Sequence, residues 1–287
     1  MGEYFFLNGE IIRARDAFLH ITDLALLRGF GIFDFCRTQN GRPLLLDRYL
    51  TRFFNSAAFL ELDIPFSKEN IKNIVLSLLK KNNIVESGIR MVLTGGYTEN
   101  GYTPGRPNFF ILIEKVNFPD KFLYDNGIKL HLLEHQRELS HIKSINYLTA
   151  ISIRNTLKKD KAYDVLYHFN GNVLEVSRSN IFIVKDNSIV TPVNKILPGI
   201  TRSTVITLAK ELFTVEERDV PVGDLLQADE IFMTGTTKKV LPVNKIDDHR
   251  VGKGKPGPVT QKLKSLYRDF ENNISDISDP GNQVSFK

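Results

Sequence analysis

The sequence is poor in cysteine, with Cys36 as the single thiol among its 287 residues. One thiol excludes an internal disulfide and any cysteine-rich metal site. The neighbours Ile32 and Phe35 predict that Cys36 is buried as an ordinary apolar residue. The six histidines contain no His-Glu-x-x-His or comparable ligand spacing. We therefore predict no metal site.

Long apolar runs are also lacking. No segment approaches the ~20 apolar residues of a membrane helix. The first six residues are acidic and then strand-like, without the basic flank and apolar stretch of a targeting segment. We therefore expect a cytoplasmic protein with no membrane contact. A chain of 287 residues with 42% apolar and 25% charged residues is expected to form one large or two medium globular domains.

The sequence also lacks a strongly basic cluster. The net charge is +5, but the runs 158–161 and 253–255 are short and are mixed with acidic residues or glycine. Neither is interleaved with aromatic residues, as a nucleic-acid surface would be. We therefore expect no nucleic-acid partner. The net positive charge is compatible with a small anionic ligand.

What the chain does contain is a set of hairpin signals. Asn-Gly pairs at 8–9, 40–41 and 170–171 each separate short apolar or alternating runs, which is the pattern of a two-residue β-turn. Helical spacing of apolar residues predicts amphipathic helices over 47–60, 67–82, 150–157 and 201–212, with Ser67 as an N-cap. Buried strands are predicted over 88–94, 108–115 and 230–233, and a glycine- and proline-rich loop over 95–107 is a candidate wall of a site.

This layout predicts an α+β protein with two domains. A small N-terminal α+β domain is expected over 1–117, and a linker over 118–122, where a proline interrupts the pattern. A larger C-terminal domain is expected over 123–274. The polar residues 275–287 show no periodicity and predict a flexible tail.

Two residues in the larger domain indicate pyridoxal phosphate chemistry. Lys143 opens the run Lys-Ser-Ile-Asn-Tyr-Leu, and Glu175 follows one strand-turn-strand later. A lysine forms a Schiff base with an aldehyde only when its amine is neutral, so it needs a desolvated or cationic setting. A carboxylate across the ring would keep the pyridine nitrogen protonated. Taken alone, either residue is more often a surface charge, and the surrounding residues are what favour the chemical interpretation.

Three segments are candidates for binding a phosphate. Residues 198–202 precede a helical run, so the first N–H groups of that helix would point at an anion. The alternative is an ordinary glycine turn with Thr201 as the N-cap. Gly235–Thr237 follows a strand and is a second donor set, and Arg52 is a candidate for a bidentate contact.

Five ordered motifs resemble the class IV (fold type IV) pyridoxal phosphate aminotransferases, which include branched-chain aminotransferases, D-amino-acid aminotransferases and aminodeoxychorismate lyases. The likeness runs from about Tyr4 to about Asp247. It implies a small α/β domain, a larger domain with a barrel-like sheet, and a homodimer that holds pyridoxal 5′-phosphate between the domains. The motifs begin at Arg52, Lys143, Glu175, Leu197 and Gly235.

The resemblance implies a role for individual residues. Lys143 matches the Schiff-base lysine, Glu175 the partner of the ring nitrogen, and Tyr147 the phenol that binds the ring oxygen. The residues that match the phosphate cup are Arg52, Ile200, Thr201 and Thr236.

The substrate groups are less well defined by the motifs. The run from Lys143 to Asn146 is similar to D-amino-acid enzymes, whereas Tyr147 is typical of branched-chain ones. The Arg-x-His carboxylate trap of D-aminotransferases is missing after Thr94. Instead, three arginines stand beside motif positions and either bind substrate carboxylates or form structural ion pairs. The candidate substrate residues are Arg28, which the dimer would supply from the neighbouring subunit, with Arg90, Arg178 and Thr237.

One strand presents Phe33, Phe35 and Arg37 on the same face. These residues either line the side-chain pocket or, for the two aromatics, belong to the core. The predicted activity is exchange of an amino group between an amino acid and a 2-oxo acid such as 2-oxoglutarate, with D-amino acids favoured. The alternatives are a branched-chain L-amino-acid aminotransferase, a 4-amino-4-deoxychorismate lyase, and a non-catalytic protein that has retained the fold.

Overall fold

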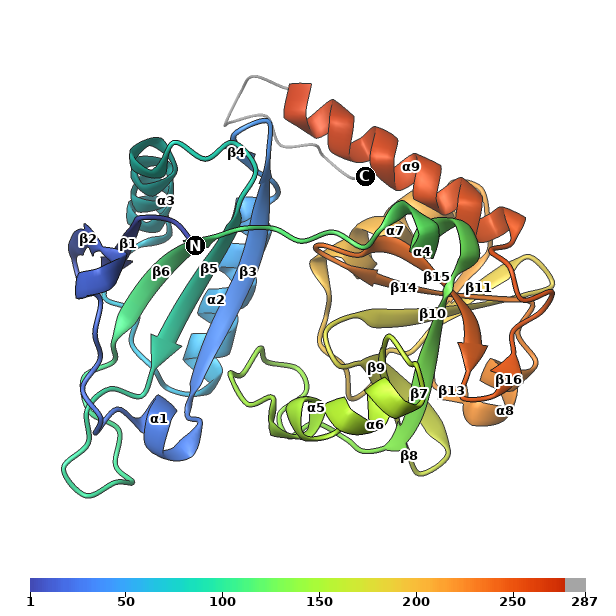
Figure 1. Ribbon diagram of the computed structural model, residues 1–287, viewed down its shortest axis with the longest axis horizontal. Coiled ribbons are helices and arrows are strands. Elements are labelled where there is room, and N and C mark those ends of the chain that lie inside the picture. Colours follow the sequence, from blue (N-terminus) through green and yellow to red (C-terminus); the bar gives the residue numbers. More distant parts are fainter. Residues whose placement is uncertain (277–287) are drawn as a thin grey trace.

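The computed structural model describes residues 1–276, and side chains through residue 274. Its strands form two sheets that stand side by side (Figure 1). Every strand up to residue 114 belongs to the first sheet, and every strand from residue 128 onward belongs to the second. The structure therefore has mixed helices and strands, as the sequence predicts.

The first sheet has six strands in the described part of the chain, and all neighbouring pairs are antiparallel. In spatial order they are β2 (Glu10–Arg13), β1 (Tyr4–Leu7), β6 (Phe109–Glu114), β5 (Gly88–Thr94), β3 (Gly31–Gln39) and β4 (Arg42–Pro43). Two helices pack against it, α2 (Leu46–Phe59) and α3 (Lys68–Asn82). Their apolar faces and the inner face of the sheet form one core, in which Cys36 is fully buried and unpaired, as predicted.

The second sheet curls into a half-barrel and has ten strands in the described residues. Its main path runs β12 (Val215–Glu217), β11 (Ser188–Thr191), β10 (Asn180–Lys185), β14 (Glu230–Gly235), β15 (Lys239–Ile246), β7 (Ile128–Glu134), β8 (Asp164–Phe169), β9 (Asn172–Val176) and β13 (Val220–Pro221), and β16 (His249–Arg250) pairs with β15. Parallel pairs join β15 to β7, β7 to β8 and β11 to β12.

All three predicted hairpins are confirmed. The Asn-Gly pairs join β1 to β2, β3 to β4, and β8 to β9, each as a two-residue turn. The asparagines have φ near +50° and the glycines are also left-handed, as this turn type requires. Ser67 caps α3 as predicted, because its hydroxyl accepts a hydrogen bond from the Asn70 amide at 3.1 Å.

The helices of the second half differ from prediction in two places. The run expected over 150–157 is two short helices, α5 (Leu148–Ser152) and α6 (Arg154–Lys159), which are divided at Ile153. The run expected over 201–212 is α7 (Ile200–Lys210). The remaining helices are α1 (Leu24–Arg28), α4 (Lys121–Asn126), α8 (Val222–Leu226) and α9 (Pro258–Asp276).

The long helix α9 is absent from the sequence predictions. Its buried residues Val259, Leu263 and Tyr267 recur at four-residue intervals, and they pack with α7 and β14. Its first turn is capped from elsewhere, because the Glu230 carboxylate accepts hydrogen bonds from the Val259 and Thr260 amides at 3.0 and 2.8 Å. Residues 275 and 276 of the predicted tail form the end of this helix, and the rest of the tail lies outside the described residues, so its flexibility stays a prediction.

The segment 115–120 connects the two sheets (Figure 1). It overlaps the expected linker at 118–120, whereas Lys121 already begins α4. The division into domains over 1–117 and 123–274 stays a prediction.

No helix in the described part of the chain is both long and apolar enough to cross a membrane.

Candidate functional site

A cavity of about 960 Å³ is lined by residues from both sheets. Twelve of the thirteen predicted site residues lie on its wall, and Arg28 does not. They come from β3, β5 and α2 of the first half and from the loops and strand ends of the second. The lining residues are Phe33, Phe35, Arg52, Arg90, Lys143, Tyr147, Glu175, Arg178, Ile200, Thr201, Thr236 and Thr237.

Lys143 is brought to the cavity by backbone pairing with β3. The Phe33 amide donates to the Lys143 carbonyl at 2.9 Å, and the Ile145 amide donates to the Gly31 carbonyl at 3.1 Å. The ammonium nitrogen lies 4.5 Å from the centre of the Phe33 ring. Burial, and secondarily the positive charge of Arg52, lower the pKa of Lys143 to about 7. A substantial share of this amine is therefore neutral and nucleophilic at neutral pH.

We predict that Lys143 reacts with an aldehyde at a lower pH than other lysines of the chain. Covalent trapping of pyridoxal phosphate by borohydride should rise with pH and reach half its maximum near pH 7, because only the neutral amine reacts. An unperturbed lysine titrates near ~10.4. The measurement is the labelled fraction of each lysine peptide by mass spectrometry, with the exposed Lys262 as the internal control. Parallel pH curves for the two peptides would contradict the perturbed amine.

Glu175 faces the same cavity from β9 and is 4% exposed. Its carboxylate accepts hydrogen bonds from Arg137 Nε at 2.8 Å and from the Leu197 amide at 3.0 Å. Burial raises the pKa of Glu175, and the Arg137 charge opposes this rise. The sequence predictions missed Arg137. Arg137 lies in the loop after β7, where the sequence shows no periodic pattern. Its role is recognisable only from its contact with Glu175.

Tyr147 lines the cavity at the start of α5. Its ring lies 5.8 Å from that of Phe33, between centroids. Burial raises the pKa of its hydroxyl, so Tyr147 is a neutral hydrogen-bond donor at physiological pH.

The guanidinium fork of Arg52 is occupied by Asp34, which the sequence predictions also missed. Arg52 Nε and Nη2 donate to the two Asp34 carboxylate oxygens at 2.9 and 2.7 Å, and Nη1 donates to the Pro198 carbonyl at 3.2 Å. The bidentate partner of Arg52 is thus a fully buried carboxylate of β3. Arg52 contributes positive charge and holds the turn before α7 in place.

That turn presents the first amides of α7 to the cavity. The N-cap is Gly199, so the alternative that placed Thr201 in that position is wrong. A Cβ at residue 199 would approach Asn180 Oδ1 to 2.0 Å, and the Asn180 amide donates to the Leu197 carbonyl at 2.8 Å. Glycine is therefore required for the close packing that aims the helix end at the cavity.

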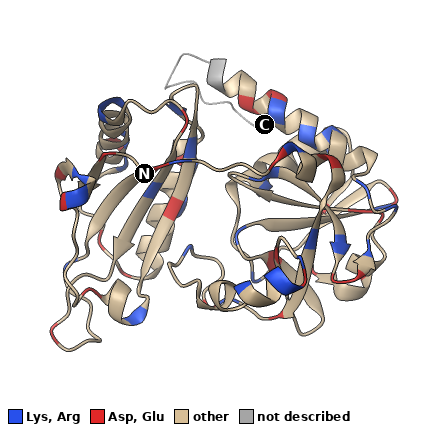
Figure 2. Cartoon of the chain, viewed as in Figure 1, with Lys and Arg blue, Asp and Glu red and all other residues tan. Residues whose placement is uncertain are grey.

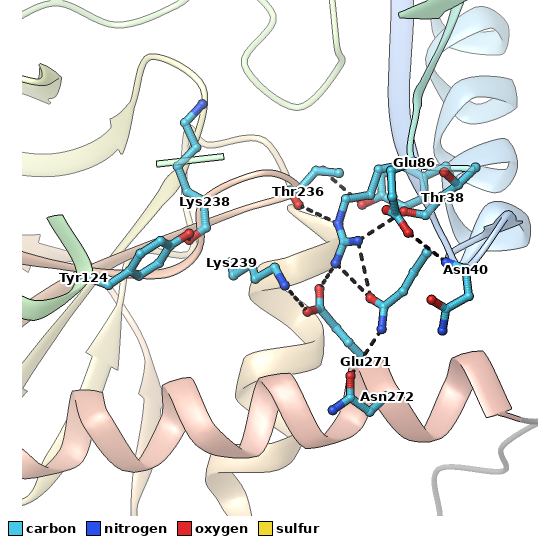
Figure 3. A network of polar contacts seen from close by, with 12 residues as sticks. Thr38, Asn40, Glu86, Tyr124, Thr236, Lys238, Lys239, Glu271 and Asn272 are labelled. Carbon is cyan, nitrogen blue, oxygen red and sulfur yellow. Dashed lines mark hydrogen bonds and ion pairs between the residues drawn. The ribbon is translucent and has the colours of Figure 1, made fainter. Parts of the chain in front are cut away.

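The turn between β14 and β15 forms the neighbouring wall. Thr236 shares a hydrogen bond of 3.0 Å with the Tyr49 hydroxyl, and its carbonyl accepts from Arg37 Nε at 3.3 Å. Figure 3 shows this network, in which Glu271 of α9 and Lys239 also take part. Arg37 is therefore turned away from the cavity. The expectation that it lines the pocket with Phe33 and Phe35 is wrong, because the carboxylate of Glu271 holds it.

Arg90 forms the structural ion pair that the sequence analysis left as its alternative. Its Nε and Nη2 donate to Glu114 at 3.0 and 2.7 Å across neighbouring strands. The guanidinium carbon also lies 5.1 Å from the Phe33 ring centroid and 5.2 Å from that of Phe35. The pair stands in the cavity wall, where these hydrogen bonds leave Nη1 of Arg90 available.

Of the other two candidate arginines, Arg178 lies at the cavity and Arg28 does not. Arg178 lines the cavity, is 59% exposed, and has its Nη2 3.8 Å from Asp164. Arg28 is exposed at the end of α1 and donates to the Leu27 carbonyl.

The loop over 95–107, which the sequence suggested as a site wall, does not line this cavity. It packs against the α1 segment, where the Leu24 amide donates to the Gly96 carbonyl.

Figure 2 shows Lys and Arg interspersed with Asp and Glu over the elements of both sheets. On the cavity wall, most arginines form ion pairs with nearby carboxylates. Two buried hydroxyls on the wall, Ser179 Oγ and Thr234 Oγ1, make no hydrogen bond among the described residues. Unpaired buried polar atoms are rare in folded proteins, and a polar ligand in the cavity would satisfy them.

Comparisons with known proteins agree with this geometry. A family model described as Amino-transferase class IV matches residues 31–246. A putative branched-chain-amino-acid aminotransferase of Methanocaldococcus jannaschii is 34% identical over 92% of this chain and 95% of that protein. A D-alanine aminotransferase of Staphylococcus haemolyticus is 33% identical over 92% of this chain and 96% of that protein.

A similar solved structure is that of the branched-chain amino acid aminotransferase of Escherichia coli. It has a TM-score of 0.88 and 26% identity, and the match covers 94% of both chains. The likeness therefore extends over both sheets and the cavity wall.

Proposed function

Because the chain belongs to the class IV aminotransferase family, we propose that its cavity binds pyridoxal 5′-phosphate and that D-amino acids are its favoured amino donors. The family and the aminotransferase activity follow from the match over residues 31–246 and from the relatives. The acceptor in this proposal is a 2-oxo acid such as 2-oxoglutarate.

The residues of the cavity fit this cofactor. Lys143 supplies an amine that is partly neutral at pH 7. The amides of Ile200 and Thr201, with the Thr236 hydroxyl, are donors for a phosphate, and Arg52 adds a positive charge. When bound, the cofactor supplies an electron sink for the α-carbon of the substrate.

Each polar residue has a task of its own in this proposal. With the cofactor bound, the Lys143 amine would take a proton from the substrate α-carbon as a general base and would then donate it as a general acid. The Glu175 carboxylate holds a proton on the ring nitrogen, and Arg137 keeps that carboxylate charged and fixed. The Tyr147 hydroxyl donates a hydrogen bond to the ring oxygen.

One observation supports a contact with the substrate α-carboxylate, namely the Arg90 guanidinium in the wall beside the Phe33 and Phe35 rings. Glu114 fixes its orientation and leaves one edge for a substrate carboxylate. We propose Arg28 of the partner subunit in a homodimer as the second clamp residue, and Thr237 as an assisting group. This supports an amino acid bound by its α-carboxylate without an Arg-x-His trap.

The branched-chain L-amino-acid alternative has a specific observation in its favour. Phe33, Phe35 and Val92 line the cavity near Arg90 and would suit an apolar side chain. The M. jannaschii relative is likewise named for branched-chain amino acids. The two candidates differ in the hand of the amino acid, and this difference is directly measurable.

We expect the enzyme with its cofactor to react with D-glutamate and D-alanine at least about tenfold faster than with L-leucine and L-valine. A tenfold ratio corresponds to about 1.4 kcal/mol in the barrier. The measurement is stopped-flow absorbance of the cofactor in single half-reactions, so that acceptor and product release play no part.

Faster reaction with the two L-amino acids would reject the D-amino-acid proposal in favour of the branched-chain one. A third arm tests the lyase alternative. Release of pyruvate from 4-amino-4-deoxychorismate in the absence of any 2-oxo acid would support that reaction, whereas amino transfer to 2-oxoglutarate supports the transaminase.

A further inference from the structure

Four of the five arginines on the cavity wall have a carboxylate partner, and the fifth, Arg154, is exposed. This pairing makes one lysine stand out. Three arginines have an acidic partner at hydrogen-bonding distance, and Arg178 has one at 3.8 Å. The three close pairs are Arg52 with Asp34, Arg90 with Glu114, and Arg137 with Glu175. The wall also contains two partly buried lysines, Lys143 and Lys238. The proposed chemistry uses Lys143, and it gives Lys238 no role.

Lys238 is held in position by its backbone. The Tyr124 hydroxyl donates to the Lys238 carbonyl at 3.0 Å, at the turn that leads into β15. The next residue, Lys239, reaches Glu271 at 2.7 Å, whereas the Lys238 side chain extends away from that network (Figure 3). Within the described residues Lys238 has no ion pair. Burial, and then the charge of Arg178, lower its pKa to about 8, so the amine is still largely protonated at neutral pH.

Asp164 is the one carboxylate in this part of the wall, and it is incompletely satisfied. Its Oδ1 accepts hydrogen bonds from the Ser177 hydroxyl at 2.6 Å and from the Val165 amide at 2.8 Å. Its Oδ2 is buried and makes no hydrogen bond among the described residues. Lys238 and Arg178 thus contribute two positive charges to the wall, and Asp164 contributes one negative charge. The exposed Arg154 and Lys158 line the same cavity and add to the positive balance.

We propose that Lys238 and Arg178, with Asp164 beside them, form a second carboxylate subsite that receives the distal carboxylate of a dicarboxylic substrate. The inference rests on the proposed aminotransferase function, and it specifies the substrate class as dicarboxylic amino acids and 2-oxo acids. One further carboxylate neutralises the surplus charge, whereas a monocarboxylic substrate leaves that charge unpaired in a partly desolvated wall.

The test is the Lys238→Gln variant, which keeps a polar side chain of similar reach and removes the charge. Half-reaction rate constants are measured with glutamate and alanine of the faster hand, and with 2-oxoglutarate and pyruvate for the reverse direction. The ratio of dicarboxylic to monocarboxylic substrate should fall by ~10–10²-fold, the loss expected for one hydrogen bond to a charged group. The Lys238→Arg variant, which retains the charge, should recover part of the ratio.

Lys115→Gln is the matched control, because Lys115 lines the same cavity but is solvent-exposed. It should leave the ratio at the wild-type value. An equal loss for both substrate classes in Lys238→Gln would overturn the subsite and assign Lys238 a structural role, and an unchanged ratio would overturn it outright. If the wild-type enzyme prefers L-amino acids, the D-amino-acid proposal is rejected. The ratio of dicarboxylic to monocarboxylic substrates, measured with L-amino acids, would still test the subsite.

Discussion

Replacement of Lys143 by alanine is expected to lower the rate of transamination by at least about 10⁴-fold. A general base or acid alone contributes typically ~10²–10⁴-fold, and Lys143 also supplies the nucleophilic amine. No other lysine among the described residues is paired with β3 as Lys143 is. Lys238, the second partly buried lysine of the wall, stands on a different turn from the pairing of residues 143–145 with β3.

The measurement is single-turnover transfer from the better amino donor, with borohydride labelling as a second readout. The variant should bind pyridoxal phosphate through the phosphate-binding groups but yield no labelled peptide at residue 143. A small primary amine added to the solution should restore part of the turnover. Activity within tenfold of the wild-type protein would show that Lys143 is not the reacting amine.

Replacement of Glu271 by glutamine is expected to lower the free energy of unfolding by about 3–5 kcal/mol, the cost of removing one partner of a buried ion pair. Glu271 lies on α9 and is 2% exposed. It pairs with the buried Arg37 and with Lys239, so its loss leaves two cations without their acid. Hydrogen bonds from Arg37 to the Thr236 and Thr38 carbonyls remain, but they do not neutralise the charge.

Urea unfolding gives the free energy directly. Asp125→Asn is the matched control, since Asp125 pairs with Lys121 on an exposed surface of α4 and should change stability by less than about 1 kcal/mol. The double variant Arg37→Met, Glu271→Leu should regain much of the lost stability, because an apolar pair needs no compensation. If Glu271→Gln and Asp125→Asn had equal effects, the buried network would contribute no more than a surface pair.

The parts of the fold that the sequence predicted are those determined by neighbours along the chain. Asn-Gly turns and four-residue apolar spacing depend on backbone geometry within a few residues, and the predicted hairpins and the helices α2, α3 and α7 are present. Ser67 was identifiable as a cap for the same reason. The ordered motifs placed twelve of the thirteen predicted site residues on one cavity.

The parts that were missed depend on partners distant in sequence. Arg52 meets Asp34 from another element, and Glu175 meets Arg137 from a loop 38 residues earlier. An acid within an apolar strand, as Asp34 is in β3, was the available signal. For Arg90, the partner Glu114 could not be chosen from several acids without the register of β5 and β6.

The strand β3 is fastened to the second half of the molecule at both of its ends. Near its start, Gly31 and Phe33 exchange backbone hydrogen bonds with the Lys143 segment. Near its end, Arg37 reaches Glu271. Two fixed points alone would leave a rotation about the length of β3, but α2 supplies further attachments away from that line. Arg52 donates to the Pro198 carbonyl at 3.2 Å, and Arg48 donates to the Thr204 hydroxyl at 2.9 Å. These attachments oppose the rotation, so the width of the cavity depends on α2 and α7 remaining bound to each other.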